Sequence, residues 1–445
     1  MTAIATVILA AGAGSRMKSK MPKVLHQIAG RAMVSHLLDT VSTLNATKNI
    51  VVVASGMDDV RAEVAPAQTA VQKEALGTGH AVAAALPDLE GFVGDILVLY
   101  GDTPLITAKT LQAMIEARRA STDNAVVVLG FEPEDPLEYG RLVTNEAGDL
   151  EAIVEFADAT DEEKSVRLCN SGVMAISSEH IEGLISAVGN ENAKGEYYLT
   201  DIVSIARSKG LTCKVVKGQE TELLGVNNRV QLAEAEEIAQ ERWRKQAMTQ
   251  GATLIDPKSV FFSHDTILGQ DVVVEPNVFF GPGVTVADGV RIKAFSHIEG
   301  ATVGAKSQVG PYARLRPGAA LGEEVKVGNF VEVKKASLDD GAKVSHLSYI
   351  GDAHVGAQAN IGAGTITCNY DGYDKAKTVI GAGAFVGSNT ALVAPVRIGK
   401  GAIIGAGSTV TKEVAEDALM VERASETQKA GWAKRFRAMK ARLKK

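Results

Sequence analysis

The first half of the chain alternates between two hydrophobic patterns. Stretches with helical spacing, such as MVSHLLDTVSTL and HAVAAAL, lie between short runs of β-branched and aliphatic residues. Those runs, typical of buried strands, are ATVILA, NIVVVA, DILVLYGD and NAVVVLGF. Such alternation predicts a parallel sheet covered by helices, so we expect an α/β domain over residues 1–226.

The segment that follows, residues 227–249, contains neither glycine nor proline and is rich in Ala, Glu, Gln and Arg. These residues favour helix, because they lose little conformational freedom in it. We therefore predict a long connecting helix at this point.

A different period begins after this helix. One apolar residue recurs every six positions, with three steps of five and one insertion. The series is Leu268, Val274, Phe280, Val286, Ile292, Ile298, Val303, Val309, Leu315, Leu321, Val327, Val333, Leu338, Val344, Ile350, Val355, Ile361, Ile380, Val386, Leu392, Ile398, Ile404 and Val410.

A period of six drifts against the 3.6 residues of an α-helical turn. It fits a flat strand and a tight corner, repeated as the faces of a prism, with the apolar residue and the small fifth residue of each unit inside. Each unit buries its apolar side only against its neighbours, so stability comes from stacking. A globular β-domain with chance spacing would not keep this register. We predict such an all-β prism over residues 250–423, followed by a basic tail over 424–445.

Composition and charge argue against several classes of protein. The 445 residues carry a net charge of −6, which gives no reason to expect nucleic-acid binding. Three scattered cysteines fit neither a disulfide framework nor a zinc site. The sequence predicts no membrane span and no signal peptide, so we expect a cytoplasmic protein.

The first predicted strand leads into a glycine-rich turn with two basic residues beyond it. Glycines in such a turn let backbone N–H groups face a phosphate chain. A guanidinium adds a planar fork for phosphate oxygens, and a lysine adds a compact charge. The Gly-Lys-Ser/Thr of a P-loop is missing, and a purely structural strand–helix turn is the alternative. The residues are Leu9, Ala10, Ala11, Gly12, Gly14, Arg16 and Lys23.

This motif resembles that of the sugar-phosphate nucleotidyltransferases, whose domain is Rossmann-like. The resemblance implies UTP and Mg²⁺ as ligands, with Arg16 and Lys23 acting on the phosphates. It also implies Asp102 and Asn227 as metal ligands, although a strand-end cap for Asp102 and a helix N-cap for Asn227 are alternatives. Further matched positions that contact the nucleotide or the sugar are Gln72, Gly77, Thr78, Tyr100, Gly101, Gly140, Glu155 and Asn170.

Three segments break the simple repeat of the second half. Arg314-Leu-Arg316 is basic, and Lys334 precedes His346 and Tyr349 at close spacing. The stretch between Ile361 and Lys375 is an insertion that must loop out of the prism.

The repeat resembles the hexapeptide-repeat acyltransferases, and the breaks resemble the acetyltransferase half of bifunctional bacterial enzymes that make UDP-N-acetylglucosamine. The family implies a left-handed parallel β-helix, a homotrimer, and glucosamine 1-phosphate and acetyl-CoA as substrates. It implies His346 as general base, oriented by Glu332. Matched binding positions are Arg316, Lys334, Tyr349, Asn360 and Lys375 for the sugar phosphate, Asn369 and Tyr370 at the reacting centre, and Ala363, Ser388, Ala406 and Arg423 for acetyl-CoA.

Two other interpretations predict different residues. A monofunctional sugar-1-phosphate nucleotidyltransferase with a structural β-helix would need no base or cation cluster in the second half. A non-enzymatic scaffold would not need Arg16, Lys23, Asp102 and Asn227 together. The basic tail is either a solvated helix or a further contact to CoA phosphates.

Overall fold

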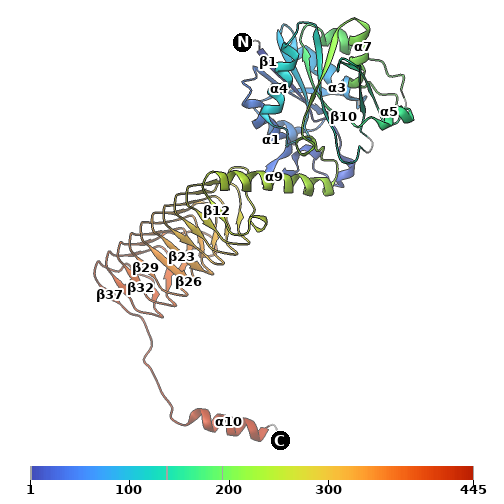
Figure 1. Cartoon of the computed structure of the whole chain (residues 1–445). Coiled ribbons are helices and arrows are strands. Elements are labelled where there is room, and N and C mark those ends of the chain that lie inside the picture. The colour runs from blue at the N-terminus through green and yellow to red at the C-terminus, as the bar shows by residue number, and fades with distance from the viewer. Residues whose placement is uncertain (1–2, 137–138, 193, 444–445) are drawn as a thin grey trace. The chain divides into compact units, whose positions relative to one another are not determined.

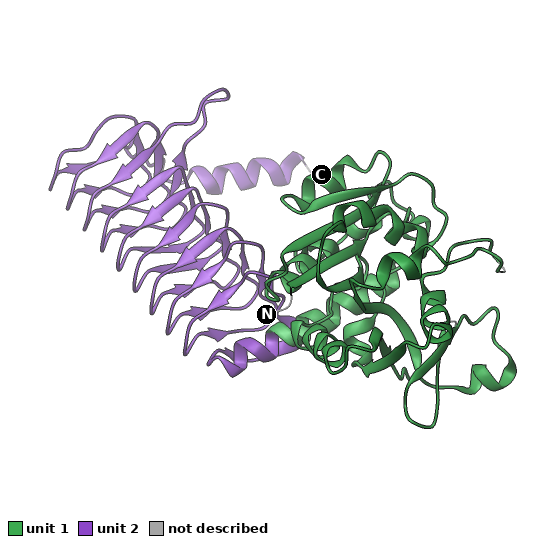
Figure 2. Ribbon diagram, turned by 90° about the horizontal axis from the view of Figure 1, so that it is seen from above, with its two compact units in different colours: residues 1–243 green, residues 244–445 purple. Residues whose placement is uncertain are grey.

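The computed structural model describes residues 3–136, 139–192 and 194–443. The chain divides into two compact units, Met1–Trp243 and Arg244–Lys445 (Figures 1 and 2). The boundary falls inside the predicted connecting helix, which is α9, Arg229–Thr249. No helix in the described ranges has both the length and the apolar content to span a membrane.

Within the described residues, the first unit is built on a nine-stranded sheet of order β11-β7-β10-β6-β1-β4-β5, with β8 and β9 added beside β10. Strands β1, β4, β5 and β6 are parallel, as predicted. The prediction of a wholly parallel sheet is wrong at β10, which is antiparallel to β6 and β7. The strands are β1 (Ala3–Leu9), β4 (Lys48–Ala54), β5 (Gln68–Gln72), β6 (Gly94–Tyr100), β7 (Asn124–Phe131), β8 (Arg141–Thr144), β9 (Leu150–Val154), β10 (Cys169–Ser177) and β11 (Thr212–Lys217), besides a hairpin of β2 (Gln27–Ile28) and β3 (Arg31–Ala32).

Helices cover both faces of this sheet, because alternate residues of each buried strand point to opposite sides. Val7 and Ile50 belong to the core under α3, α6 and α7, whereas Ile8 and Val51 belong to the core under α1, α2 and α4. The helices are α1 (Met33–Ser42), α2 (Asp58–Val64), α3 (Thr78–Ala85), α4 (Ala108–Arg119), α5 (Asp161–Ser165), α6 (Ile181–Ile185), α7 (Ile202–Ser208) and α8 (Glu220–Leu223).

The second unit is a left-handed parallel β-helix, which confirms the predicted fold class. In its described part, three parallel sheets form the faces, and each strand pairs with the third strand after it. The first face contains β12 (Thr253–Leu254), β14 (Val273–Val274), β17 (Arg291–Ile292), β20 (Gln308–Val309), β23 (Lys326–Asn329), β26 (Lys343–His346), β29 (Asn360–Ile361), β32 (Phe385–Val386), β35 (Ile403–Ile404) and β37 (Leu419–Met420).

The other two faces have the same construction. The second face contains β15 (Phe279–Phe280), β18 (His297–Ile298), β21 (Arg314–Leu315), β24 (Glu332–Lys334), β27 (Tyr349–Gly351), β30 (Ile366–Cys368), β33 (Ala391–Val393) and β36 (Thr409–Val410). The third face contains β13 (Ile267–Leu268), β16 (Thr285–Val286), β19 (Ala301–Val303), β22 (Ala319–Leu321), β25 (Ala336–Leu338), β28 (Ala353–Val355), β31 (Thr378–Ile380) and β34 (Val396–Ile398).

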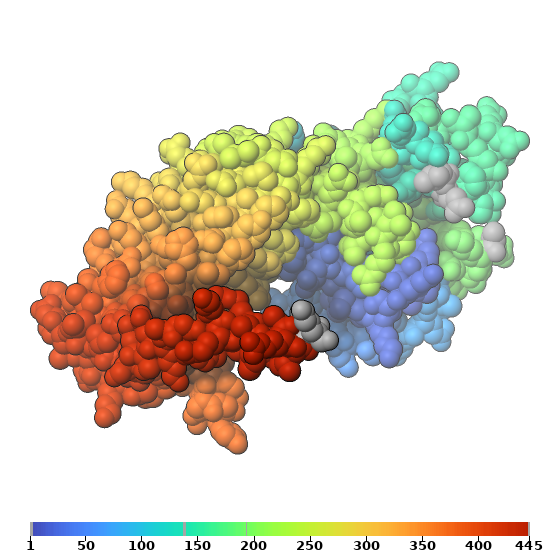
Figure 3. Space-filling model, turned by 90° about the horizontal axis from the view of Figure 1, so that it is seen from below, coloured from blue at the N-terminus to red at the C-terminus, as the bar shows by residue number. Residues whose placement is uncertain are grey.

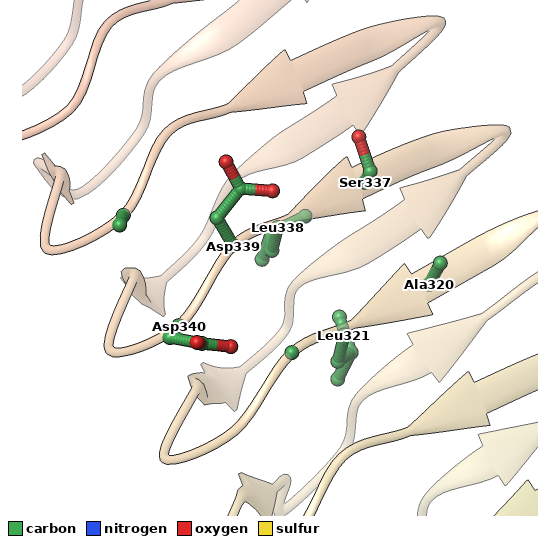
Figure 4. A pocket seen from close by; sticks show the side chains of 8 residues that line it. Ala320, Leu321, Ser337, Leu338, Asp339 and Asp340 are labelled. Carbon is green, nitrogen blue, oxygen red and sulfur yellow. The ribbon is translucent and has the colours of Figure 1, made fainter.

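Burial within the prism follows the six-residue period. Leu321 and Leu338 point into the prism, while Ala320 and Ser337, one residue earlier, point away from it (Figure 4). The small fifth residues are also inside, since Ser307, Ala359 and Thr365 are fully buried. The interior therefore holds one large and one small side chain for each face of each coil.

The insertion departs from the coil path as predicted. Tyr370 and Lys375 face each other in an isolated antiparallel bridge, so residues 371–374 form the turn of a short protruding loop. Figure 3 shows an orange projection in this part of the chain. In the basic tail, α10 (Trp432–Leu443) is exposed along its length, and residues 444–445 lie outside the described residues.

A matched pair of isoleucines tests the inward–outward alternation. Ile404 is 1% exposed and Ile403 is 49% exposed. Ile404→Ala removes buried methyl groups from a narrow core, so we expect it to lower the free energy of unfolding by about 2–5 kcal/mol. Ile403→Ala should cost less than about 1 kcal/mol. Urea unfolding of both variants measures the difference, and equal losses would contradict the alternation.

Candidate functional site

The glycine-rich turn lies at the carboxyl ends of two neighbouring parallel strands. Leu9 of β1 is in register with Tyr100 of β6. The N–H of Gly101 donates to the carbonyl of Leu9 at 3.0 Å. Asp102 is thereby held beside the turn. Open α/β sheets bind ligands at this end of their strands.

Glycine at position 14 is required by geometry. Its φ is +64°, and a Cβ there would lie 2.6 Å from the Cβ of Lys23. Any larger residue would force the segment that carries Lys23 away from the turn. The missing side chain therefore lets a cation lie directly against the turn that is expected to face phosphates.

Four of the predicted residues meet in one cluster. The Nζ of Lys23 donates to a carboxylate oxygen of Asp102 and, at 3.0 Å, to Oδ1 of Asn227. The guanidinium of Arg16 donates to the same Asn227 oxygen at 2.9 Å. Residues far apart in the sequence thus form a site with two cations and two oxygen ligands.

The donor set of this cluster fits magnesium. One carboxylate and one amide oxygen converge on a single cationic atom, the Nζ of Lys23. Mg²⁺ is commonly held by one or two protein oxygens of this kind together with substrate phosphates. Among the described residues no group of three or more His, Cys, Asp or Glu side chains could hold a metal.

Asn228, rather than Asn227, caps the connecting helix. The Oδ1 of Asn228 accepts from the N–H groups of Val230 and Gln231 at 2.9 and 3.0 Å. The side chain of Asn227 is consequently available to the cluster, and the N-cap alternative for it is wrong. The N–H of Val226 also donates to the carbonyl of Asp102 at 2.9 Å, which joins the two ligand-bearing loops.

The Gln72 segment forms a second wall near the strand ends. The buried Nε2 of Gln72 donates to the carbonyl of Gly77 at 3.0 Å. Gly77 has a φ of +109°, and a Cβ would lie 2.6 Å from the carbonyl oxygen of Tyr197. The hydroxyl of Thr78 accepts from the N–H of Leu199 at 3.0 Å. Sequence analysis missed the contribution of Tyr197 and Leu199, which carry no motif.

Gly140, Glu155 and Asn170 come together, as the resemblance implied. Asn170 N–H donates to the carbonyl of Gly140 at 2.8 Å, and a Cβ on Gly140 would lie 3.5 Å from Oε2 of Glu155. Burial raises the pKa of Glu155, while its contact with the hydroxyl of Thr200, at 3.4 Å, opposes that shift. Burial likewise raises the pKa of Tyr100, and the charges of Asp102 and Glu155 add to it.

In the second unit, the acetyl-transfer candidates occupy equivalent positions of successive coils. The register Val327↔Val344↔Ile361↔Val386↔Ile404 runs along the first face. The residues two places beyond those five, at one corner of the prism, are Asn329, His346, Ala363, Ser388 and Ala406.

Glycines let this corner stack closely. A Cβ on Gly362 would lie 2.5 Å from the N of Ser388, and one on Gly387 would lie 2.5 Å from the N of Ala406. A Cβ on Gly405 would lie 3.4 Å from the guanidinium of Arg423. The corner is therefore a row of close-packed backbone that leads from His346 toward Arg423.

The partner of His346 differs from the expected one. Asn329 Oδ1 lies 2.6 Å from the Nδ1 of His346. Glu332, which we expected to orient His346, instead accepts from Arg316 at 2.8 Å. Glu332 extends from the second face, whereas His346 ends a strand of the first. Coil register would have identified Asn329, because it occupies the position of His346 one coil earlier.

Three cations gather where the second face ends. Arg316 and Lys334 directly follow the paired residues Leu315 and Val333 in adjacent coils. The charge of Lys375 lowers the pKa of Lys334, with smaller contributions from burial and from Arg316. Mutual repulsion of this kind favours binding of an anion. The loop of the insertion therefore brings Lys375 to the two cations of the coils.

Neighbouring polar residues are held by specific contacts. The amide of Asn369 donates to Asp352 at 2.5 Å, a partner that sequence analysis missed. Tyr370 donates to the carbonyl of Gly372 at 2.5 Å. The Tyr349 hydroxyl would be 2.4 Å from a Cβ on Gly351, so that glycine gives the ring its place. Asn360 lies on the first face, in register with Lys343 and Phe385.

An apolar ladder runs along the corner that carries His346. Phe295 stacks on Tyr312 with ring centroids 4.9 Å apart, and Tyr312 stacks on Phe330 at 5.2 Å. Leu347 continues the series, and all four have positive φ and exposed side chains. A shallow groove on the second face is lined by Tyr312, Phe330, Leu347 and Tyr349, among others. The depression drawn in Figure 4 belongs to the third face, whose strands carry none of the candidate residues.

Comparisons with known proteins agree with this division. A MobA-like NTP transferase domain matches residues 6–167, and a bacterial transferase hexapeptide pattern of six repeats matches residues 377–412. The chain is 60% identical over 443 residues to Bifunctional protein GlmU of Rhodospirillum rubrum, covering 100% of this chain and 99% of that protein.

Two further relatives have the same name. Bifunctional protein GlmU of Paramagnetospirillum magneticum is 59% identical over 441 residues, covering 99% of this chain and 98% of that protein. That of Sphingopyxis alaskensis is 55% identical over 435 residues, covering 97% and 96%. A solved inositol-1-phosphate CTP transferase from T. maritima has a TM-score of 0.42 and 17% identity over 54% of this chain and 95% of that one, which is too distant to support an argument.

The raised pKa of Glu155 predicts a pH-dependent stability. The folded protein holds this proton more tightly than an ordinary carboxyl group of pKa 4.5, so the stabilisation is present at low pH and lost as pH rises through the raised pKa. Glu155→Gln should therefore gain thermal stability relative to the parent between about pH 4 and about pH 8.

Thermal melts at both pH values measure this difference. Glu151→Gln, which alters an exposed carboxylate on β9, provides the matched control. A stability difference for Glu155→Gln that is the same at both pH values would contradict the assignment.

Proposed function

The chain belongs to the family of bifunctional GlmU proteins, and from this membership we infer that it catalyses two reactions that make UDP-N-acetylglucosamine. The second unit transfers an acetyl group from acetyl-CoA to glucosamine 1-phosphate. The first unit then transfers uridylate from UTP to N-acetylglucosamine 1-phosphate and releases pyrophosphate. The observation that carries this inference is the presence of two chemically different clusters, one in each unit.

Uridyl transfer needs no protein nucleophile. A phosphate oxygen of the sugar phosphate attacks the α-phosphorus of UTP, and pyrophosphate is the leaving group. Crowded negative charge is the main barrier, so charge neutralisation and alignment supply the catalysis. Arg16 and Lys23, joined through Asn227, would bind the phosphates. Asp102 and Asn227 would hold Mg²⁺, which when bound neutralises phosphate charge.

Specificity in this unit would come from two walls. Gln72, Gly77 and Thr78 form a rigid segment suited to the uracil and ribose. Gly140, Glu155 and Asn170 form the second, near enough to Tyr100 for the charge of Glu155 to raise its pKa, and their carboxylate and amide can bind sugar hydroxyls and the N-acetyl group. The small residues of the turn, from Ala10 to Gly14, would admit the triphosphate next to Leu9.

Acetyl transfer requires a base and an anion site. The neutral His346 takes a proton from the glucosamine nitrogen, that nitrogen forms a bond to the thioester carbonyl carbon, and the CoA thiolate leaves. Arg316, Lys334 and Lys375 would bind the sugar phosphate, with Tyr349 and Asn360 on the sugar. Asn369 and Tyr370 would lie at the reacting centre. Ala363, Ser388, Ala406 and Arg423 would bind the CoA chain and its phosphates.

We further propose that the β-helices assemble as a homotrimer through the apolar ladder. Bulky residues rarely adopt positive φ, and such strain is retained where it serves a function. Here it places Phe295, Tyr312, Phe330 and Leu347 outward, each exposed by about half or more. They adjoin His346, so subunit contact there would complete the acetyl-transfer site.

The two proposed sites predict reciprocal losses. Asp102→Ala removes a ligand of the first cluster, and we expect uridyl transfer to fall by about 10²–10³-fold with acetyl transfer retained. His346→Ala removes the base, and we expect acetyl transfer to fall by about 10²–10⁴-fold with uridyl transfer retained. Separate assays of free thiol and of pyrophosphate on each purified variant measure both rates.

Each variant serves as the control of the other. Loss of both activities in either folded variant would contradict two independent sites. Retention of acetyl transfer in His346→Ala would show that another group is the base.

The ladder predicts a change in assembly. Asparagine adopts positive φ readily, so the double variant Tyr312→Asn, Phe330→Asn removes two rings without backbone strain. We expect a smaller species by analytical ultracentrifugation, loss of acetyl transfer and retention of uridyl transfer. An unchanged sedimentation coefficient would contradict assembly through this ladder.

A further inference from the structure

The neighbour of His346 is an amide on the adjacent coil. Asn329 ends β23, His346 ends β26, and the two residues are paired in the parallel register of the first face. Asn329 Oδ1 and His346 Nδ1 are 2.6 Å apart. The two side chains therefore extend from equivalent points of two stacked coils.

This contact determines the proton distribution of the imidazole. A carboxamide oxygen can only accept a hydrogen bond, so the Nδ1 of His346 must carry the hydrogen. The remaining ring nitrogen, Nε2, then bears the lone pair that a base requires. The opposite tautomer would present an N–H to the substrate and could not remove a proton.

We propose that Asn329 is the positioning residue of the acetyl-transfer reaction, fixing the tautomer and the ring orientation of His346. The inference rests on the proposed role of His346 as base. Asn329 itself need not touch either substrate.

The backbone holds this amide in place. The carbonyl of Asn329 accepts from the N–H of Leu347 at 3.0 Å, so the hydrogen bonds between the two strands continue to the end of β23. The side chain is half-buried, which limits its freedom. The next residue, Phe330, begins the corner with a φ of +55° and stacks on Tyr312. The short asparagine side chain thus starts from a fixed point.

A neutral partner has a different consequence from a carboxylate. A nearby carboxylate would favour the protonated imidazole and raise its pKa. An amide accepts the hydrogen bond and orients the ring without adding a charge beside it. Glu332, the carboxylate that we expected in this role, pairs with Arg316 at 2.8 Å.

The test compares Asn329→Ala and Asn329→Asp in the full-length protein. Alanine removes the acceptor, and we expect kcat for acetyl transfer to fall about 10–100-fold, with the KM for acetyl-CoA changed by less than about threefold. Aspartate keeps an acceptor, so we expect it to restore most of the rate at alkaline pH. It should also move the acidic limb of the kcat/KM profile upward by about one pH unit, because the new charge stabilises the imidazolium.

Two controls accompany these variants. Gln308→Ala removes an amide from β20, the strand beside β23 on the same face, and should leave acetyl transfer unchanged. Besides the protonatable His346 itself, the charged residues of β23 and β26 are Lys326 and Lys343. Both lysines remain in every variant, so a shift of the acidic limb reports the new carboxylate. Uridyl transfer by the same preparations reports the intact first unit.

The outcomes separate this inference from the proposed function. Wild-type acetyl transfer in Asn329→Ala, with loss in His346→Ala, would overturn the role of Asn329 alone. A pH profile of Asn329→Asp that superimposes on the parent profile would also overturn it. Acetyl transfer retained in His346→Ala would overturn both the base and its positioning residue.

Discussion

The narrow interior of the prism is the constraint on which the second unit depends. Each face of each coil has room inside for one large and one small side chain, so a slip by one residue would exchange the buried and exposed sets. The coils must therefore keep a strict register, and side chains at equivalent outward positions of successive coils lie next to one another. The same packing that stabilises the coils therefore aligns Asn329, His346, Ala363, Ser388 and Ala406 at one corner.

The first unit reaches its chemistry by another route. Its sheet brings Leu9 and Tyr100 to a common edge, and loops after those strands supply Lys23, Asp102 and Asn227. Here the strands fix only where each loop begins, and the close contact between Gly14 and Lys23 determines where Lys23 lies. The first unit thus builds its candidate site from loops, and the second builds its candidate site from a regular repeat.

The period of six made the prism and its insertion predictable from sequence, because a repeat constrains every coil alike. The strand–glycine–basic motif likewise identified residues that meet in the structure. Contacts between outward side chains were harder to predict, since each has several neighbours of similar chemistry. Glu332 pairs with Arg316 rather than His346, and Asn228 rather than Asn227 caps α9, because one position along the chain decides which group a short side chain reaches. The antiparallel β10 could not be recognised from composition, since buried strands of either direction look alike.

The close-stacked corner of the β-helix has a consequence for donor selection. Neighbouring coils are spaced at about 4.8 Å, as in any sheet. The glycines at 362 and 387 bring backbone against backbone along this corner, and Gly405 lies against the side chains of Val421 and Arg423, so close packing fixes the spacing between His346 and Arg423. On the proposed assignment of acetyl-CoA to this row, an acyl donor would be selected by the length of the arm between its reactive carbonyl and its anionic end. A truncated thioester would then reach one end of the row but not the other.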